Sequence, residues 1–499
     1  MTLTRLCRGV AGLVSVVSVA TVPLAAAGNT NLIDAVKAGQ LDTVRALVKR
    51  ADVGATELDG TTALHWAVHL DNLAAADLLI RSGAKVQAAN RYGATPLWLA
   101  CVNGNAAIVE RLLNAGADPN TTMPEGDTVL MTAARTGKVD VVKRLLARGA
   151  DVNARETWKN QTALMWAAAR NNVATVEALI EAGADVQART KFTKPKITGG
   201  KYRIRESEES SDVTLEAGFT PLLFAARAGA LETVKVLLAH GASVSDTATD
   251  SMSPLVLAIA NTHYELAEYL LGQGADPNAS KQGWTPLHQL VFTRRPNLGQ
   301  NNPGMVAREP LDSLTFARKL LAKGADPNAP LTKDGNVVNV GRHILTHVGA
   351  TPFWLASQLL DFPMMKVLLE AGADPLRPNS TGTTPLMAAA GLAMERPGEQ
   401  QGTPEDVAKA VKMQLDLGAD PNTIDENGNT ALHGTAVWGS NGAVEYLVAA
   451  GAKLDVRNKK GLTPWSVANH YYFADAVLAQ PQTAALLRRL MEDRGIKVE

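Results

Sequence analysis

Apolar side chains recur along this chain in short helical stripes separated by polar turns. Residues 95–105, TPLWLACVNGN, place a narrow apolar stripe on one short segment and end in a turn. Residues 106–116, AAIVERLLNAG, then supply Ile, Val and Leu at helical spacing. Such spacing is typical of an amphipathic helix that buries one face. The stretch 95–116 is therefore predicted to be a pair of helices joined by a tight turn.

The same pattern returns along most of the chain. Seven of the ten intervals between successive Thr-Pro-Leu markers are 32 to 34 residues long, and a Gly-Ala marker follows 21 residues later in eight of ten units. Two markers that keep one period indicate a repeat architecture. The first marker starts at Thr62, Thr95, Thr128, Thr162, Thr220, Ser253, Thr285, Thr351, Thr384, Thr430 and Thr463.

Each unit can be interpreted physically. Thr or Ser caps a helix, and Pro beside it supplies the backbone angle of the first helical position. Gly116 suits the C-terminal cap of the second helix, and a polar loop follows it. One such pair cannot bury its apolar face alone, so neighbouring pairs are expected to stack into a solenoid.

These motifs resemble the ankyrin repeat family. TPLHQL at Thr285–Leu290 and the GADPN endings at Gly116, Gly274 and Gly324 carry the resemblance, which extends over residues 31–490. It implies an all-α fold of about twelve helix-turn-helix units, forming a single solenoid over residues 31–499. Within the family, the sequence is similar to secreted bacterial proteins with many ankyrin repeats.

Cys101 is the only cysteine after Cys7. Its environment decides whether its thiol is a reactive group or a packing side chain. Aligned with the other units, it occupies the place of Ala134 and Ala226 in the inner-helix stripe. A histidine that could hold a thiolate does not occur near it in the sequence. We therefore predict that Cys101 is a buried packing residue.

The N-terminus predicts export. Arg5 and Arg8 precede an apolar run, and Ala25 and Ala27 form an A-x-A site, so residues 1–27 are expected to be a cleaved signal peptide. A membrane anchor is the alternative, but the run is short for a span. The mature protein is therefore expected in the periplasm or outside the cell. After cleavage of the signal peptide, it is not expected to span the membrane. The formal net charge of +0 argues against nucleic acid as a partner.

Insertions interrupt the period near residues 187–216, 293–312, 329–349 and 391–404. ITGGKYRI, at residues 197–204, is predicted to be a β-hairpin with a Gly-Gly turn. The basic stretch Lys191–Arg205 that contains it precedes Glu206, Glu208, Glu209 and Asp212. It could grip a partner or be a solvated insertion, and the sequence leaves both open.

The resemblance implies that a protein partner binds the concave face, through loop tips and the ends of inner helices. Exposed aromatic and arginine side chains are the residue types that anchor protein interfaces. Any single ring could instead brace neighbouring loops, whereas Trp66, Trp98, Trp166 and Trp354 are expected in the core. The predicted partner-binding residues are Tyr92, Trp158, Phe219, Trp284, Trp438, Arg91, Lys281, Arg135, Arg170 and Arg227.

The sequence contains few residues arranged as in known catalytic motifs. It therefore predicts a non-enzymatic binding scaffold without cofactor or metal. The scaffold is expected to be monomeric. The alternative is a metal-dependent or hydrolytic activity around His343 and His347, which are four residues apart and could share a helical face. A HExxH glutamate is missing from that pair. By the resemblance, His65, His288 and His433 are expected to be structural, bonding between loops.

Overall fold

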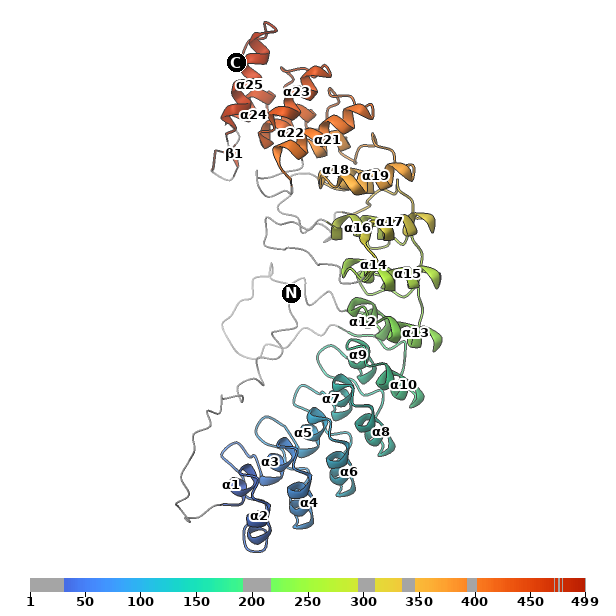
Figure 1. The fold of residues 1–499 in the computed structure, drawn as a ribbon, viewed down its shortest axis with the longest axis vertical. Coiled ribbons are helices and arrows are strands. Elements are labelled where there is room, and N and C mark those ends of the chain that lie inside the picture. The colour runs from blue at the N-terminus through green and yellow to red at the C-terminus, as the bar shows by residue number, and fades with distance from the viewer. Residues whose placement is uncertain are drawn as a thin grey trace.

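A computed structural model shows a curved column of stacked helix pairs (Figure 1). The signal segment 1–27, the expected hairpin at 197–204 and most of the expected insertions lie outside the described residues. The structure describes residues 31–191, 217–294, 310–333, 346–392 and 402–498, apart from residues 471, 474, 475 and 478.

One row of helices lines the concave side of the column (Figure 1). A threonine or serine before most of these inner helices caps the first turn; Thr95 Oγ1, for example, accepts a hydrogen bond from Trp98 N at 3.2 Å. Gly104 ends that helix in the left-handed conformation that glycine adopts without strain. The inner helices are α1 (Leu32–Lys37), α3 (Ala63–His69), α5 (Pro96–Asn103), α7 (Val129–Thr136), α9 (Ala163–Ala168), α12 (Pro221–Ala228), α14 (Pro254–Ala260), α16 (Pro286–Arg294), α18 (Pro352–Gln358), α20 (Pro385–Ala389), α22 (Ala431–Trp438) and α24 (Pro464–His470).

A second row packs behind the first on the convex side. We number the repeats 1 to 12 by these pairs, from α1–α2 to α24–α25, which confirms the prediction of an all-α stack of about twelve units. The outer helices are α2 (Leu41–Leu47), α4 (Leu73–Arg81), α6 (Ala106–Asn114), α8 (Val139–Ala147), α10 (Val173–Glu181), α13 (Leu231–Ala239), α15 (Tyr264–Gly272), α17 (Ser313–Ala322), α19 (Phe362–Glu370), α21 (Pro404–Asp416), α23 (Asn441–Ala449) and α25 (Pro481–Glu492).

The core runs between the two rows, and the small inner-helix residues let neighbouring repeats approach closely. Cys101 is fully buried there, and burial raises the pKa of its thiol well above the ordinary value. The prediction that Cys101 is a packing residue is confirmed. Trp354 is also fully buried as expected, whereas Trp66, Trp98 and Trp166 are only half-buried.

Histidines join consecutive repeats, as expected. His65 Nδ1 lies 2.7 Å from Thr62 Oγ1, and its Nε2 lies 3.0 Å from the carbonyl oxygen of Ala94 in the next repeat. His288 and His433 make the same two kinds of contact. The structural role predicted for these three side chains is confirmed.

Repeat 12, the last of the stack, contains the two short strands found among the described residues. Tyr472–Phe473 (β1) pairs antiparallel with Ala476–Val477 (β2), between α24 and α25. This short hairpin was not predicted from the sequence. Among the described residues, we find no helix that is long and apolar enough to cross a membrane.

Candidate partner-binding face

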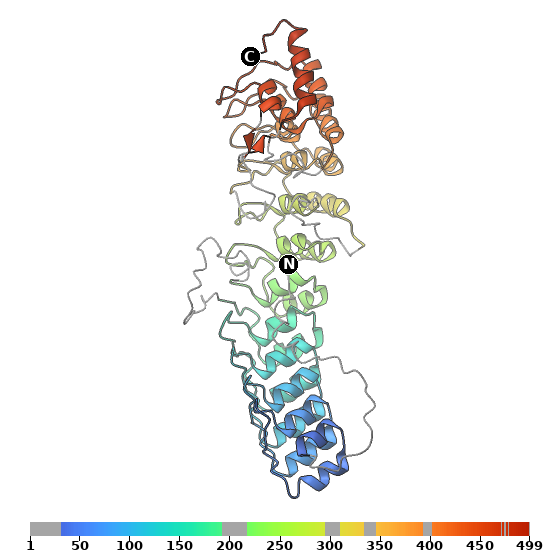
Figure 2. The same cartoon turned by 90° about the vertical axis from the view of Figure 1, so that its left-hand side faces the viewer.

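The described loops before the inner helices follow one another along the concave side and run along the left edge of the column in Figure 2. Their tips are joined by backbone hydrogen bonds: Arg91 N donates to Asp59 O at 2.7 Å, and Thr249 N donates to Ala217 O at 3.0 Å. We call this surface, with the exposed ends of the inner helices, the loop face. Because the tips hold one another, their side chains are positioned before any partner arrives.

Tyr92 projects from the loop tip of repeat 3, with 54% of the residue exposed. Its hydroxyl accepts a hydrogen bond from Arg91 Nη2 at 2.6 Å, and the guanidinium lies 4.9 Å from the ring centroid. Asn90 Oδ1 accepts hydrogen bonds from Tyr92 N and Ala94 N, both at 3.0 Å, which closes the turn beneath the ring. The structure thus confirms the predicted exposure of Arg91 and Tyr92 and brings the two side chains together.

Trp158 projects from a wider loop tip, with 41% of the residue exposed. Glu156 N pairs with Gln161 O, one residue further along than in the loop that Asn90 and Ala94 close, which accounts for the 34-residue spacing from Thr128 to Thr162. The buried carboxylate of Glu156 fills this wider turn. It accepts hydrogen bonds from Trp158 N at 2.5 Å, Lys159 N at 2.7 Å and Gln161 N at 2.9 Å.

Cationic side chains lie over aromatic rings along the loop face. The Arg135 guanidinium lies 5.5 Å from the Trp166 ring centroid, and that of Arg227 lies 5.3 Å from Phe219. Such stacking holds a guanidinium in place while leaving its charge available. Arg135, Arg170 and Lys281 are exposed as predicted, and Arg227 is half-buried.

An acidic group lies among these cations. Burial raises the pKa of Asp127, and the neighbouring carboxylates of Glu156 and Glu125 raise it further, while Arg135 opposes them. A carboxyl group in this position holds its proton more readily than an exposed aspartate does. Acidic and basic side chains thus lie near one another on the loop face of repeats 4 and 5.

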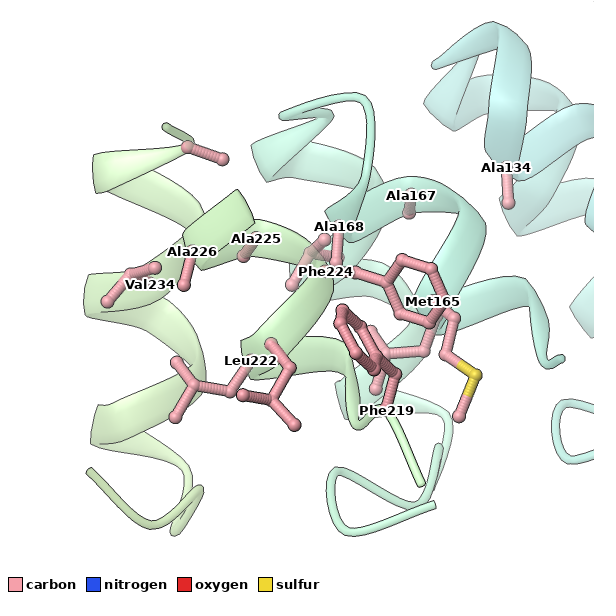
Figure 3. Close-up of a cluster of buried hydrophobic side chains, with 14 of the residues drawn as sticks. Ala134, Met165, Ala167, Ala168, Phe219, Leu222, Phe224, Ala225, Ala226 and Val234 are labelled. Carbon is pink, nitrogen blue, oxygen red and sulfur yellow. The ribbon is translucent and has the colours of Figure 1, made fainter. Parts of the chain in front are cut away.

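Three of the predicted aromatic anchors are buried, so the expectation that all five rings share one exposed surface is wrong. Phe219 is 1% exposed, and Trp284 and Trp438 are each 8% exposed. Phe219 turns inward against Met165 and Phe224 (Figure 3), with 5.3 Å between the two phenyl centroids. Trp284 Nε1 donates to Gln289 Oε1 at 3.0 Å. These rings are packing residues, and Phe219 (Figure 3) and Trp438 lie against the preceding repeats; the sequence left open a related alternative, in which single rings brace neighbouring loops.

Aliphatic residues on the loop face were missed or undervalued. Leu58 is fully exposed at the loop tip of repeat 2, at the position that Arg91 takes in repeat 3. Leu70 and Val102 are exposed at the ends of inner helices α3 and α5. Aligning LDGTTALH with RYGATPLW would have found Leu58. A search confined to aromatic and charged residues passed over it.

The metal alternative does not fit His347. This residue lies in the loop before Thr351, not on a helix, and its ring is buried edge-on against Trp354. Its Nε2 lies 3.1 Å from Gln358 Oε1. His343 lies outside the described residues, and the described residues contain no group of three or more His, Cys, Asp and Glu side chains that could hold a metal. The expectation that the two histidines share a helical face is therefore wrong at His347.

Comparison with known proteins agrees with the stacked geometry. The family model "Ankyrin repeats (3 copies)" matches residues 32–123, 115–190 and 201–281, and the model "Ankyrin repeat" matches residues 427–459. The chain belongs to the ankyrin repeat family. As an ankyrin-repeat chain, it is built as a scaffold for protein–protein interaction.

Its relatives use ankyrin repeats within different proteins. Human ankyrin repeat and SOCS box protein 16 is 33% identical over 48% of this chain and 52% of its own length. The Arabidopsis thaliana E3 ubiquitin-protein ligase KEG is 27% identical over 52% of this chain and 16% of its own length. The solved human ASB11 ankyrin repeat domain is 25% identical, with a TM-score of 0.40 over 50% of this chain and 100% of that domain.

The chain therefore spans about half the length of the first relative and much less of the second. These relatives are eukaryotic ankyrin-repeat proteins. They lend no support to a narrower likeness to secreted bacterial members of the ankyrin family.

Proposed function

We propose that this chain is a non-enzymatic, extracytoplasmic scaffold that captures a protein partner on the loop face of repeats 2 to 5. The observation that carries the proposal is the exposure of Tyr92 and Trp158 at loop tips, with Leu58, Leu70 and Val102 exposed on the same face. Of the large exposed hydrophobic side chains of the described chain, these five lie on the loop face of repeats 2, 3 and 5. Exposed apolar groups that gather on one face mark an interaction site.

The proposed affinity comes from preorganisation. Glu156 holds the Trp158 loop and Asn90 holds the Tyr92 loop, so little conformational freedom is lost when a partner docks. Arg91 and Arg135 lie against aromatic rings, and among the described residues neither joins an ion pair. A partner with apolar anchors and carboxylates could therefore engage both kinds of group at once.

The location belongs to the proposal as well. Residues 1–27 carry the pattern of a secretory signal, which supports export. Resemblance to secreted bacterial members of the family, as far as the sequence motifs carry it, points the same way. Mass spectrometry of the protein recovered from a periplasmic fraction tests this: a first residue at Gly28 supports export, and an intact Met1 in the cytosol contradicts it.

The binding test compares two exposed aromatic residues. Trp158→Ala and Tyr446→Ala truncate residues that are 41% and 42% exposed, but Tyr446 lies on outer helix α23, away from the loop face. Partners captured from extract are identified and then titrated as purified proteins against all three forms. We expect Trp158→Ala to weaken binding and Tyr446→Ala to leave it unchanged. Equal affinity of all three forms would move the site away from repeats 2 to 5.

A further inference from the structure

A side-chain bridge connects the ends of consecutive outer helices. Asn120, in the loop after α6, donates from Nδ2 to Gly149 O at 3.1 Å, and its Oδ1 accepts from Asp151 N at 2.8 Å. Gly149 and Asp151 follow α8, so one asparagine ties two repeats together. We call this pair of bonds the asparagine bridge. The same two bonds are made by Asn153, Asn278, Asn328 and Asn422.

Leu376 occupies the bridge position between repeats 9 and 10. Its backbone is held as in the other repeats, because Leu376 N donates to Asp374 Oδ1 at 2.9 Å, just as Asn120 N donates to Asp118 Oδ1 at 2.8 Å. The leucine side chain has neither a donor nor an acceptor, so it cannot bond to the next repeat. It is exposed instead. The local backbone is the same, but the side chain that forms the bridge is missing.

The outer helices also separate at this junction. Most consecutive outer helices pack closely, but α19 and α21 scarcely touch. An ion pair joins α17 to α19, with Arg318 Nη2 at 3.7 Å from Glu370 Oε2, whereas the described residues contain none that joins α19 to α21. The convex side of the column therefore lacks both kinds of tie between repeats 9 and 10.

The apolar core changes from one cluster to another at the same place, and the two clusters overlap there. The first cluster extends from Leu32 to Ala373 with Ala388 of repeat 10, and the second runs from Leu386 to Met491 with Leu360 of repeat 9. Met413 and Leu417 of α21 also pack against the first cluster, and Phe362 of α19 packs against both. Between the clusters lies a polar contact, in which Gln414 Nε2 donates to Ser357 Oγ at 2.9 Å. Gln414 Oε1 is buried without a hydrogen-bond partner. A buried amide that is only half satisfied stabilises an interface less than an apolar contact of the same size.

The concave side stays connected. Ser380 N donates to Val348 O at 2.8 Å, and Trp354 Nε1 donates to Thr383 O at 2.7 Å. The inner helices α18 and α20 pack closely. The junction is thus tied along the loop face and open along the convex side.

From this arrangement we infer that the junction between repeats 9 and 10 is a built-in joint. Repeats 1 to 9 and repeats 10 to 12 form two bodies that rotate about the tied loop face. The motion changes the curvature of the column, so the second body can close over a partner held by the first. The inference concerns the chain itself and does not require that the proposed binding site is correct.

The junction between repeats 6 and 7 shows why several features are needed together. Ser245 takes the bridge position there, and α13 and α15 also touch little. The apolar core is nevertheless continuous across it, and Lys235 Nζ lies 5.7 Å from the Tyr269 ring centroid, which joins α13 to α15. We assign the joint to the junction at Leu376, where the core changes from one cluster to another as well.

The joint can be measured with two pairs of spin labels read by pulsed electron–electron distance spectroscopy. Labels at Lys366→Cys and Glu445→Cys, on exposed positions of α19 and α23, span the joint. Labels at Ala74→Cys and Lys143→Cys, on α4 and α8, span the same number of repeats, where Gln87 donates to Gly116 O and Asn120 forms the full bridge. Cys7→Ser is included throughout, and the buried Cys101 thiol does not take the label.

We expect a broader distance distribution for the first pair than for the second. Leu376→Asn supplies the donor and the acceptor of the bridge and should narrow the first distribution, while Asn120→Leu removes a bridge and should broaden the second. Circular dichroism confirms that each variant retains its helices. Equal widths for the two pairs, or a first distribution that Leu376→Asn leaves unchanged, would overturn the joint.

Discussion

His288 Nε2 lies 3.1 Å from the carbonyl oxygen of Ala350, which is 62 residues further along the chain. On the other side of the ring, Nδ1 lies 3.2 Å from Thr285 N. A backbone N–H can only donate, so Nδ1 accepts and the Nε2 proton is donated to Ala350. The histidine that joins repeats 8 and 9 is therefore neutral, and burial lowers its pKa to about 4.

This geometry predicts that the folded protein loses stability as the pH falls. The ordinary pKa is 6.5, so between pH 6.5 and about 4 the unfolded chain binds a proton at His288 that the folded chain does not. The stabilisation is fully present above pH 6.5 and is lost as the pH falls towards 4, by about 3 kcal/mol at this one site. Urea unfolding across this pH range measures it.

His288→Gln is the matched control for the acid sensitivity. It should be less stable at pH 7 and should lose less stability than the native chain on going from pH 6.5 to 4. His65 and His433, whose pKa values burial also lowers, remain in both proteins and do not affect the difference. Parallel stability curves for the two proteins would show that His288 does not titrate as inferred.

Substituting Gly391 and Gly451 by alanine separates the cost of a left-handed backbone from the cost of a steric clash. Both are left-handed, with φ of 95° and 91°, but a Cβ on Gly391 would lie 1.8 Å from Trp438 Cδ1, whereas a Cβ on Gly451 would meet nothing within 4 Å. Gly451→Ala should cost about 1 kcal/mol of unfolding free energy. Gly391→Ala should cost about 1–3 kcal/mol more, because the buried indole has to move. Urea midpoints give both values, and equal costs would contradict the packing of Trp438.

A buried ion pair fastens repeat 8 to repeat 9. Arg294 Nε lies 2.8 Å from Asp361 Oδ2, and the two side chains are 13% and 1% exposed. Asp361→Asn retains a side-chain oxygen that can cap α19, but it leaves the buried guanidinium of Arg294 without a counter-charge. We therefore expect a loss of about 3 kcal/mol in unfolding free energy. Asp416→Asn breaks the exposed pair with Lys412 and should cost less than about 1 kcal/mol. Similar losses for both variants would show that the Arg294 pair behaves as a surface pair.

The repeat fold could be predicted because its signals are local and periodic. A threonine cap, an alanine stripe and a glycine end recur at one spacing, and each dictates a short piece of helix. Cys101 followed from alignment with Ala134 and Ala226 alone. The position of a small residue in a repeat determines its burial, because every neighbouring repeat presents the same surface to it.

The aromatic side chains were placed less well, because two repeat positions were treated as one. Tyr92 lies three residues before the capping Thr95 and points outward, whereas Phe219 and Trp284 lie immediately before Thr220 and Thr285, where Ala94 is buried in repeat 3, and turn inward. The space for a ring at that position is left by neighbours such as Met165 and Phe224 (Figure 3), and loop spacing does not encode that volume. The joint at Leu376 was also missed, because a lost bridge is visible only once the partner of each asparagine is known.

The loop that carries Trp158 allows two roles to be tested separately: holding the ring in place and contacting a partner through the ring. Glu156→Ala removes the acceptor of three backbone N–H groups, so the loop should loosen, at a cost of about 2–3 kcal/mol in unfolding free energy. Trp158→Ala keeps those bonds and should change stability by less than about 0.5 kcal/mol, because the ring is exposed. Amide hydrogen exchange at residues 158, 159 and 161 should accelerate in Glu156→Ala and remain slow in Trp158→Ala. If a partner binds through the ring held by this loop, both variants should lose affinity, the first by freeing the ring and the second by removing it. Unchanged exchange in Glu156→Ala would show that the carboxylate does not hold the loop.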